Sequence, residues 1–397
     1  MSKSTLSLLP LALLLCACGG NAGSSSDLGS ITITDAIGRE VSLAPGKAER
    51  IVCIGAGALR LYSYVGDPAK ICGVERIEVE QGEGGEFGYL NSPYAIRPYQ
   101  KVFGHYWQNL PSCGTGGPKA QVVEEEEIFA CRPDLIISAY ENDLAGMNQL
   151  SEDLNVPVVT VSYGKTEAFD PKLLESIQIL GKALGKEERA EELVDYINGM
   201  EQDLQNRQKG IAAEDKPSVY LACQANYGLK SFGSSSAQYS IFDAAGVKNY
   251  LDEKGLVGYQ PSVNLEDLVV DGPDKVILDA SGLQMLKADY QVAETKQVIE
   301  SISAVKNGEV YLQMPYNSYY TNLEIAYADA YFAGKVCFPE RYKNVDMAQK
   351  ANEITNMFLG VDFYSNPNRD DDITDVIYGG FAKVEPSLEE FLNERVA

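Results

Sequence analysis

Glu126-Glu127-Ile128-Phe129-Ala130-Cys131-Arg132-Pro133-Asp134-Leu135-Ile136-Ile137 has a near copy later in the chain, Glu266-Asp267-Leu268-Val269-Val270-Asp271-Gly272-Pro273-Asp274-Lys275-Val276-Ile277. In each segment an acidic pair opens a short helical turn, and a Pro-Asp pair follows at the same distance from the first Glu. The apolar run that comes next indicates a buried strand. The repeat therefore predicts two similar lobes, and two similar lobes predict a ligand held between them.

The totals agree with two soluble lobes. The chain has 397 residues, which is too long for one ordinary core and long enough for two lobes of domain size. It is 45% hydrophobic and 23% charged, a globular composition unlike that of disordered or multispanning membrane proteins. The formal net charge of −24 at pH 7 repels phosphate backbones, so we do not expect nucleic acid as a partner.

Residues 1–17 are predicted to be a targeting segment. Lys3 gives a positive start, and the apolar run that follows is too short to span a bilayer stably. The ending Leu15-Cys16-Ala17-Cys18 resembles a bacterial lipoprotein signal. That resemblance implies lipid attachment on Cys18, a flexible tether over 18–29 and a protein anchored to the outer side of the cell membrane. The alternative is an ordinary secretory signal cut elsewhere, which also exports the protein.

The other cysteines do not indicate a metal or redox motif. No C-x-x-C spacing occurs, so neither a zinc ribbon nor a thioredoxin-type motif is supported. Several lie in apolar, strand-like runs, where a cysteine usually behaves as a small buried hydrophobe. We assign no pairing to Cys53, Cys72, Cys113, Cys131, Cys223 and Cys337.

The N-terminal lobe is predicted over residues 30–168. Residues 31–43 have the alternation and central turn of a β-hairpin. A strand at 50–54, a helix after Gly55-Ala56-Gly57 and a strand at 70–74 have the spacing of a parallel crossover unit. The remaining elements expected in this lobe are a strand at 135–138, a helix at 142–154 and a strand at 156–161.

Residues 169–212 are predicted to connect the lobes as one long amphipathic helix or two nearly continuous ones. Apolar residues recur there at helical spacing. Asp170-Pro171 suits a helix start, whereas Gly181 and Gly185 weaken the middle. At about 1.5 Å per residue such a segment is able to run the length of both lobes, so we expect a strut rather than a flexible linker.

The C-terminal lobe is predicted over residues 213–397 and repeats the first in outline. Its apolar runs and spacings predict strands at 218–223, 274–280 and 309–312, and helices at 239–245 and 291–302. A helical tail follows at 322–336, 346–359 and 387–396. The polar stretch 366–375 offers oxygen ligands for a cation, but it lacks the Gly and the closing Glu of a calcium loop.

The order of these motifs resembles the substrate-binding proteins of ABC importers for ferric siderophores, haem and cobalamin. The matching residues are the lipoprotein start, 34–41 with Arg50-Ile51-Val52, both Glu…Pro-Asp segments, the helix from Asp170, and 242–249. The resemblance covers nearly the whole mature chain. It implies an α/β fold of two similar lobes joined rigidly by one long helix, with a ligand cleft between them and limited closure.

The resemblance also gives the two glutamates a role. In that family an acidic residue on each lobe's rim docks to basic residues of the membrane permease, and the matching positions are Glu126 and Glu266. Two carboxylates held apart by a rigid body register a protein on a two-fold transporter, and long-range attraction speeds the encounter. The alternative is that both only suit the helix dipole. Glu124, Glu125 and Glu127 are able to take over the first role.

The ligand site is predicted from topology, because ligands of open α/β sheets lie beyond the carboxyl ends of the strands. Aromatic rings there would stack on an organic chelate, and basic side chains would offset its negative charge. The residues expected to contact the ligand are Arg60, His105, Tyr106, Trp107, Lys119, Tyr140, Tyr163, Lys230, Ser234, Tyr316, Tyr319 and Tyr320.

Each of these residues has a structural alternative. A single His cannot build a zinc site by itself, and tyrosines are numerous enough for Tyr319 and its neighbours to be packing residues. Gly114-Thr115-Gly116-Gly117-Pro118-Lys119 lacks the spacing and the Ser or Thr of a phosphate loop, so nucleotide binding is not supported. Residues 233–236 are able to present donors to an oxyanion or to form a flexible loop.

The sequence thus predicts a lipid-anchored solute receptor, monomeric and without a cofactor, that delivers an iron chelate to an ABC permease. Receptors for cobalamin, haem or a metal oxyanion such as molybdate or tungstate share this architecture. An extracytoplasmic enzyme is the more distant alternative, but one His and no recognisable nucleophile–base pair leave no hydrolase site to name. An adhesive lipoprotein would need neither paired rim glutamates nor a cleft.

Overall fold

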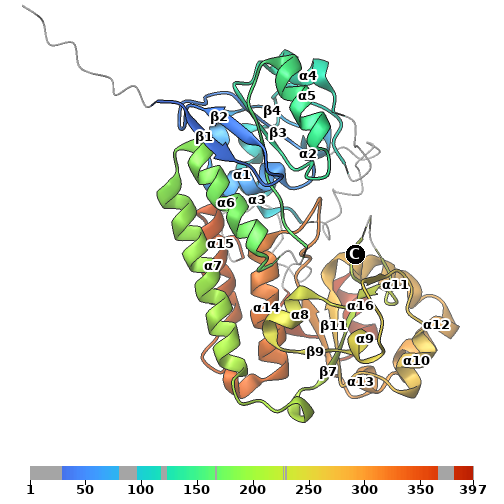
Figure 1. The fold of residues 1–397 in the computed structure, drawn as a ribbon. Coiled ribbons are helices and arrows are strands. Elements are labelled where there is room, and N and C mark those ends of the chain that lie inside the picture. The colour runs from blue at the N-terminus through green and yellow to red at the C-terminus, as the bar shows by residue number, and fades with distance from the viewer. Residues whose placement is uncertain are drawn as a thin grey trace, which may run out of the picture.

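The computed structural model describes residues 29–79, 96–117, 123–165, 168–226, 228, 230–364 and 380–396. It has two α/β lobes joined by a layer of helices (Figure 1). Cys18, the signal segment 1–17, most of the tether 18–29, Lys119 and the acidic stretch 366–375 lie outside the described residues. No helix of the described chain is long and apolar enough to cross a membrane.

The N-terminal lobe is built on a parallel sheet with the strand order β4-β3-β5-β6. The hairpin of β1 (Ile31–Thr34) and β2 (Glu40–Leu43) confirms the prediction for residues 31–43. The sheet strands agree with the predicted runs: β3 (Ile51–Ile54), β4 (Ile71–Gly73), β5 (Leu135–Ser138) and β6 (Val158–Thr160). The helices of this lobe are α1 (Ala58–Val65), α2 (Arg76–Val79), α3 (Pro98–Phe103), α4 (Glu125–Cys131) and α5 (Leu144–Leu154).

The C-terminal lobe has a five-stranded sheet in the order β13-β12-β11-β7-β9, parallel except for β13. Its strands are β7 (Ser218–Ala222), β9 (Lys248–Asn249), β11 (Lys275–Asp279), β12 (Val310–Gln313) and β13 (Ala382–Lys383). A separate ribbon pairs β8 (Ser235–Ser236) with β10 (Tyr259–Gln260). Its helices are α9 (Tyr250–Glu253), α10 (Leu265–Val270), α11 (Leu283–Asp289), α12 (Ala293–Ser301), α13 (Ser303–Lys306) and α16 (Leu388–Arg395).

The two copies of the repeat occupy equivalent places. In each lobe the aspartate of the Pro-Asp pair bonds to the residue that starts the neighbouring strand. Asp134 accepts hydrogen bonds from the backbone N–H groups of Glu49 and Arg50, and Asp274 accepts one from that of Ser218 at 2.8 Å. These hydrogen bonds lie at the surface, and they join the start of one strand to the segment that leads into its neighbour. The repeat therefore sets the same strand pairing in both lobes, as two similar lobes require.

A layer of helices lies between the two sheets (Figure 1). Alternate residues of each central strand face this layer: Ile51 and Cys53 of β3 and Val219 and Leu221 of β7 belong to one shared hydrophobic core. Their neighbours on the strands, such as Val52 and Tyr220, face separate outer cores. The layer consists of α6 (Pro171–Leu184), α7 (Glu187–Gln208), α8 (Ser240–Ala245), α14 (Leu323–Cys337) and α15 (Met347–Leu359), with α1 packed against α6.

The connecting segment differs in detail from one long helix. Asp170 caps α6 as its sequence predicts, but α6 ends at Gly185, whose φ of 61° is left-handed, and the chain turns into α7. A Cβ on Gly181 would lie 2.5 Å from the Cβ of Ala190, so this glycine allows α6 and α7 to pack closely. It is α7 that runs from the N-terminal lobe towards the C-terminal lobe (Figure 1).

The first two helices of the predicted tail, α14 and α15, do not lie on the C-terminal lobe alone, although their place in the sequence predicts this. Every residue of α14 except Lys335 is buried, and this helix packs on α8, α15 and α7. Since α15 contacts α1 and α3 of the N-terminal lobe, the tail joins the lobes instead of belonging to the second one alone. A helix that is apolar all round has to be covered on every side.

Buried carboxyl groups lie on the C-terminal side of this layer. Burial raises the pKa of Asp279, the last residue of β11, to about 7, although the side chain and backbone of Ser281 donate to one of its oxygens. Burial and then the charge of Asp279 raise the pKa of Asp329 on α14. In the folded state both carboxyls hold their protons at pH values where the unfolded chain has lost them, so stability falls as pH rises through this window.

We predict that Asp279→Asn gains stability relative to the wild type as pH rises from 5 to 8. The asparagine does not titrate, so its contribution to the free energy of unfolding does not change with pH. The wild type loses on the order of 2 kcal/mol of its free energy of unfolding over this interval, because the unfolded chain releases the Asp279 proton more readily than the folded protein does. Urea unfolding of both proteins at pH 5 and at pH 8 measures the difference in their free energy of unfolding at each pH. A constant difference between variant and wild type would contradict the raised pKa of Asp279.

Candidate interlobe binding site

The carboxyl ends of both sheets face one seam between the lobes. On the N-terminal side the strands lead into Gly55, Glu75, Tyr140 and Tyr163. On the C-terminal side β12 leads into the loop 314–322, which crosses the seam. The side chain of Asn322 donates to the backbone oxygen of Ile96 at 2.8 Å, so the loop is fixed to the first lobe at its far end. Binding sites of open α/β sheets lie at such edges.

Arg60 of α1 is a fully buried cation at this seam. Its guanidinium donates to the backbone oxygens of Ser318 at 2.6 Å and Tyr319 at 3.1 Å, and it lies over the ring of Tyr99 with its Cζ 4.8 Å from the centroid. Its Nε is buried and has no hydrogen-bond acceptor among the described residues. Because buried donors are nearly always satisfied, Arg60 is suited to meet an anion.

Glu75, directly after β4, forms the acidic counterpart. One carboxyl oxygen accepts from the backbone N–H of Gly55 at 2.9 Å and the other from the hydroxyl of Tyr319 at 2.6 Å. Burial raises the pKa of Glu75 to about 7, and these two hydrogen bonds oppose the rise. The backbone N–H of Gly117 donates to the same Tyr319 hydroxyl at 3.2 Å. One tyrosine of the second lobe thus holds two loops of the first.

The crossing loop has an unusual backbone at its tip. Tyr319 and Tyr320 have φ values of 48° and 77°, a region that costs side-chain-bearing residues on the order of 1 kcal/mol or more. The ring of Tyr320 packs on that of Tyr163 with centroids 4.4 Å apart. A Cβ on Gly57 would lie 2.5 Å from the Tyr163 ring, so only glycine allows this ring its place. Local strain held by contacts from both lobes is typical of functional sites.

The C-terminal wall of the seam is formed by hydrogen-bonded polar groups. The side-chain amide of Gln224 donates to the hydroxyl of Tyr316 at 2.7 Å, and the hydroxyl of Ser234 donates to the backbone oxygen of Gln224 at 2.7 Å. Asn317 reaches the backbone oxygen of Ala225 at 3.3 Å. The carbonyl oxygen of the Gln224 side chain is buried without a donor among the described residues, so this wall has capacity for a ligand hydrogen bond.

The structure brings part of the predicted site together and places the rest elsewhere. Arg60, Tyr163, Tyr319 and Tyr320 meet at the seam, and Ser234 and Tyr316 share the contacts of Gln224. Tyr140 and Lys230 are half-buried in loops after β5 and β7. Whether these side chains bind the ligand stays a prediction.

The segment His105-Tyr106-Trp107 is divided between surface and core. His105 and Tyr106 are exposed and stack on each other with ring centroids 4.0 Å apart. Trp107 is fully buried in the shared core, and its indole N–H donates to the backbone oxygen of Pro68 at 3.0 Å. A satisfied core tryptophan has a packing role in this structure.

Glu75, Gln224 and Asp279 lie at or directly after the carboxyl ends of the sheet strands but were not among the residues predicted from the sequence to contact a ligand. This position was the one feature of the sequence that could have identified them as candidates. Among the described residues no group of His, Cys, Asp and Glu is arranged to hold a metal ion. The cysteines at 53, 72, 113, 131, 223 and 337 are buried and free.

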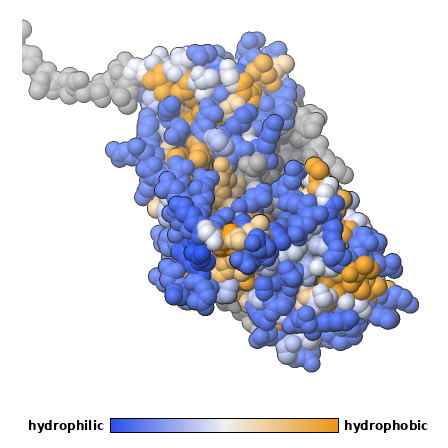
Figure 2. Space-filling model, turned by 60° about the horizontal axis from the view of Figure 1, so that its bottom comes forward, coloured by the Kyte–Doolittle hydropathy of each residue, from blue (hydrophilic) through white to orange (hydrophobic). Residues whose placement is uncertain are grey.

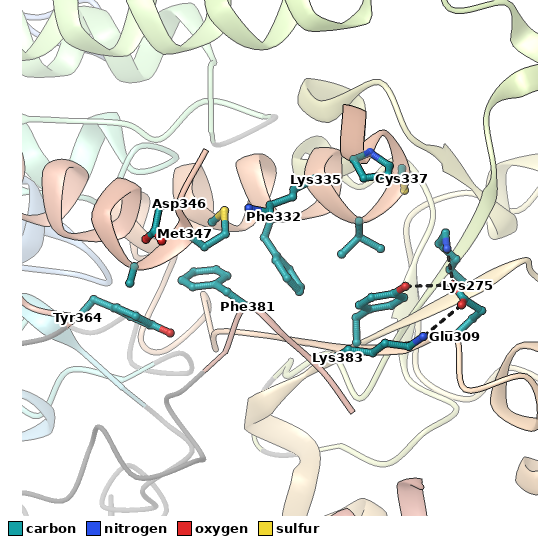
Figure 3. Close-up of a pocket in the computed structure, with 14 residues that line it drawn as sticks. Lys275, Glu309, Phe332, Lys335, Cys337, Asp346, Met347, Tyr364, Phe381 and Lys383 are labelled. Carbon is teal, nitrogen blue, oxygen red and sulfur yellow. Dashed lines mark hydrogen bonds and ion pairs between the residues drawn. The ribbon is translucent and has the colours of Figure 1, made fainter. Parts of the chain in front are cut away.

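A separate pocket of about 650 Å³ opens at the other end of the C-terminal sheet. In Figure 3, Phe332 and Phe381 lie side by side at its centre, and Lys275, Glu309 and Lys383 gather at one end. Glu309 pairs with both lysines, so its single negative charge offsets one of the two positive charges. Since Lys275 begins β11, the pocket lies at the amino ends of the strands and away from the seam.

Comparison with known proteins agrees with this architecture. The model of the periplasmic binding protein family matches residues 98–315. The uncharacterized ABC transporter substrate-binding lipoprotein YvrC of Bacillus subtilis (strain 168) is 22% identical over 190 residues, or 48% of this chain and 57% of that protein. The chain thus matches little more than half the length of this curated relative.

Solved structures share the fold over most of both chains. A periplasmic solute binding protein from Veillonella parvula DSM 2008 has a TM-score of 0.63 and 20% identity, covering 84% of this chain and 93% of its own. The molybdate-bound periplasmic binding protein MolA of Haemophilus influenzae has a TM-score of 0.62 and 19% identity, covering 83% and 98%. With the family model matching more than half of its residues, the chain belongs to the periplasmic binding protein family.

Proposed function

We propose that the protein is an extracytoplasmic receptor, anchored through Cys18, that binds an anionic iron chelate at the interlobe seam and delivers it to an ABC importer. The observation that carries the proposal is the position of Arg60, a buried cation with a spare donor where the carboxyl ends of both sheets meet. Such a cation needs an acceptor, and a bound anion provides one. We propose binding without a chemical step and expect the protein to act as a monomer.

The chemistry around Arg60 favours an organic anion. Tyr320 is half-buried and offers ring surface on which a planar chelating group is able to stack, and the buried ring of Tyr163 supports it from behind. Glu75 is half protonated near neutral pH, so it adds less negative charge than an ordinary carboxylate and is able to donate a hydrogen bond when protonated. A siderophore-like ferric chelate combines negative charge, oxygen acceptors and aromatic surface, and it brings the metal with its own ligands.

A metal oxyanion is the second candidate. The MolA neighbour is described as bound to molybdate, and a crystal structure of CeuE from Helicobacter pylori, with a TM-score of 0.54, as holding Ni(II). The donors of Arg60 suit an oxyanion as well as a chelate. Cobalamin and haem remain in the family's range. The aromatic side chains favour the chelate, because a small oxyanion makes no use of them.

We predict that a ferric catecholate or hydroxamate chelate raises the Tm of the purified protein, and that Tyr320→Ala lowers its affinity about tenfold by removing one stacking surface. Tyr364→Ala, which removes a half-buried tyrosine from the other pocket, is the matched control and leaves the affinity unchanged. Thermal shift against ferric chelates, cobalamin, haem, molybdate and tungstate, followed by titration calorimetry, measures both effects. No stabilisation by any compound at millimolar concentration would count against the receptor.

Delivery requires a surface that the permease recognises, and we propose that Glu126 and Glu266 provide it. Both are exposed, on α4 and α10, and neither forms an ion pair with the described residues. Glu124 and Glu127 instead pair with Arg76 at 3.5 and 3.1 Å, so these neighbours are engaged within the lobe. The remaining neighbour, Glu125, is exposed.

We predict that the double variant Glu126→Ala and Glu266→Ala impairs transport while leaving ligand affinity and Tm unchanged. Removal of exposed charges costs little stability, but it weakens the attraction to a basic partner and flattens the dependence of association on salt. The double variant Glu188→Ala and Glu191→Ala, which removes two exposed carboxylates from α7, is the charge-matched control. Uptake of radiolabelled ligand by cells measures the effect. Loss of ligand affinity instead would show that the two glutamates act at the ligand site, and it would contradict their assignment to the permease surface.

A further inference from the structure

The helices that carry Glu126 and Glu266 also expose apolar side chains at equivalent positions of the repeat. Phe129 is 67% exposed, and Val269 and Val270 are 38% and 86% exposed. The preceding residues of the repeat, Ile128 and Leu268, are both fully buried and fix each helix to its lobe. Large hydrophobic side chains held out in water on both lobes indicate a surface that another molecule covers.

Helical spacing places each apolar residue beside its glutamate. Phe129 lies three residues after Glu126, and Val269 and Val270 lie three and four residues after Glu266, so each set shares one face of its helix. We call these two sets the docking stripes: Glu126 with Phe129, and Glu266 with Val269 and Val270. Each combines one carboxylate with apolar surface, the composition of a protein interface rather than that of a solvated face.

The docking stripes lie far apart on a body that holds them still. Figure 1 shows α4 and α10 on different lobes, both away from the α6 and α7 side of the molecule. Figure 2 shows hydrophobic surface towards the ends of both lobes in another view. The Arg76 ion pairs and the buried Cys131 hold α4 in place, while Asn264 caps α10 and α12 packs against it. A partner therefore meets two similar stripes at a fixed separation.

We infer, on the basis of the proposed function, that Phe129 and Val269–Val270 are apolar anchors that insert into equivalent pockets on the two halves of a two-fold symmetric permease. Two copies of one surface pattern on one chain match a partner that has two copies of the complementary surface. The glutamates select basic pockets and speed the encounter, whereas the anchors slow dissociation, because buried apolar contacts carry most of an interface's affinity.

The charges around the docking stripes argue against two other occupants. Glu125 and Asp267 are exposed beside them, and an anionic lipid surface would repel these carboxylates together with Glu126 and Glu266. A second copy of the chain would bring the same acidic stripes together, with a net charge of −24 on each molecule. A partner with basic rims and apolar pockets satisfies both parts of the pattern.

The test uses the full-length protein and its cognate permease complex in lipid nanodiscs, with binding followed by interferometry at several salt concentrations. Phe129→Ser and Val270→Ser are each expected to weaken binding about fivefold or more, through faster dissociation and with the salt dependence unchanged. Leu144→Ser and Val292→Ser replace exposed apolar residues that do not belong to the docking stripes, 50% and 49% exposed, and should bind as the wild type does. Unchanged Tm values for all four variants exclude unfolding as the cause.

The outcomes separate this inference from the proposed function. One possible result is that the wild type binds the permease, the Glu126 and Glu266 variants bind weakly, and Phe129→Ser and Val270→Ser bind as the wild type does. That result would contradict the role of the apolar anchors but would leave the receptor function supported. If the wild type does not bind the permease at all, the proposed function itself fails. Binding to nanodiscs without permease that is weaker in Phe129→Ser and Val270→Ser than in the wild type would assign the stripes to lipid. Self-association in sedimentation that is lost in Phe129→Ser would assign them to a second copy, and either result overturns the inference.

Discussion

The hydrophobic core shared by the two lobes is the constraint on which the rest of the structure depends. Helix α14 is apolar on nearly every side, so it must be covered by both lobes and not by one. Residues of β3 in one sheet and β7 in the other belong to the same core as α14. Separating the lobes would expose this core, at roughly 25 cal/mol for each Å² of apolar surface uncovered. The lobes therefore behave as one body with a seam.

This rigidity links the site to its delivery. Hydrogen bonds at the seam hold Arg60 and Glu75 against the loop 314–322, and the same body carries α4 and α10 on its two lobes. Closure of such a receptor has to be a small movement of loops and lobes about the helical layer. Two hydrogen bonds of buried tyrosines cross between α14 and the N-terminal lobe: Tyr64 donates to Glu324, and Tyr327 donates to the backbone oxygen of Ala168 at 2.5 Å. Binding energy is thus available for fitting the ligand instead of ordering the lobes.

Much of the fold was predictable because its signals are local. β-Branched runs gave the strands within a residue or two, and the Pro-Asp pairs marked equivalent strand edges in both lobes. The places of α14 and α15 were not predictable, since an apolar helix carries no information about which lobes will cover it. The sequence indicated only that Gly185 weakens the helix, because a glycine that ends a helix in the left-handed conformation cannot be told from one that a continuous helix accommodates.

The site was less predictable because burial and partnership decide its chemistry. Arg60 and Tyr319 were expected there for their residue types, but Glu75 gave no signal beyond its position after a strand, and its raised pKa comes from burial that only the fold shows. Trp107 was selected as a rare aromatic residue and lies in the core, where such residues are also common.

A crystal structure of the protein with the compound that stabilises it most tests the central claim directly. Ligand density at the seam, with an anionic group within hydrogen-bonding distance of Arg60 and contacts from both lobes, is the result that the receptor account predicts. Density in the pocket between Phe332 and Phe381, or contacts with a single lobe only, would contradict it.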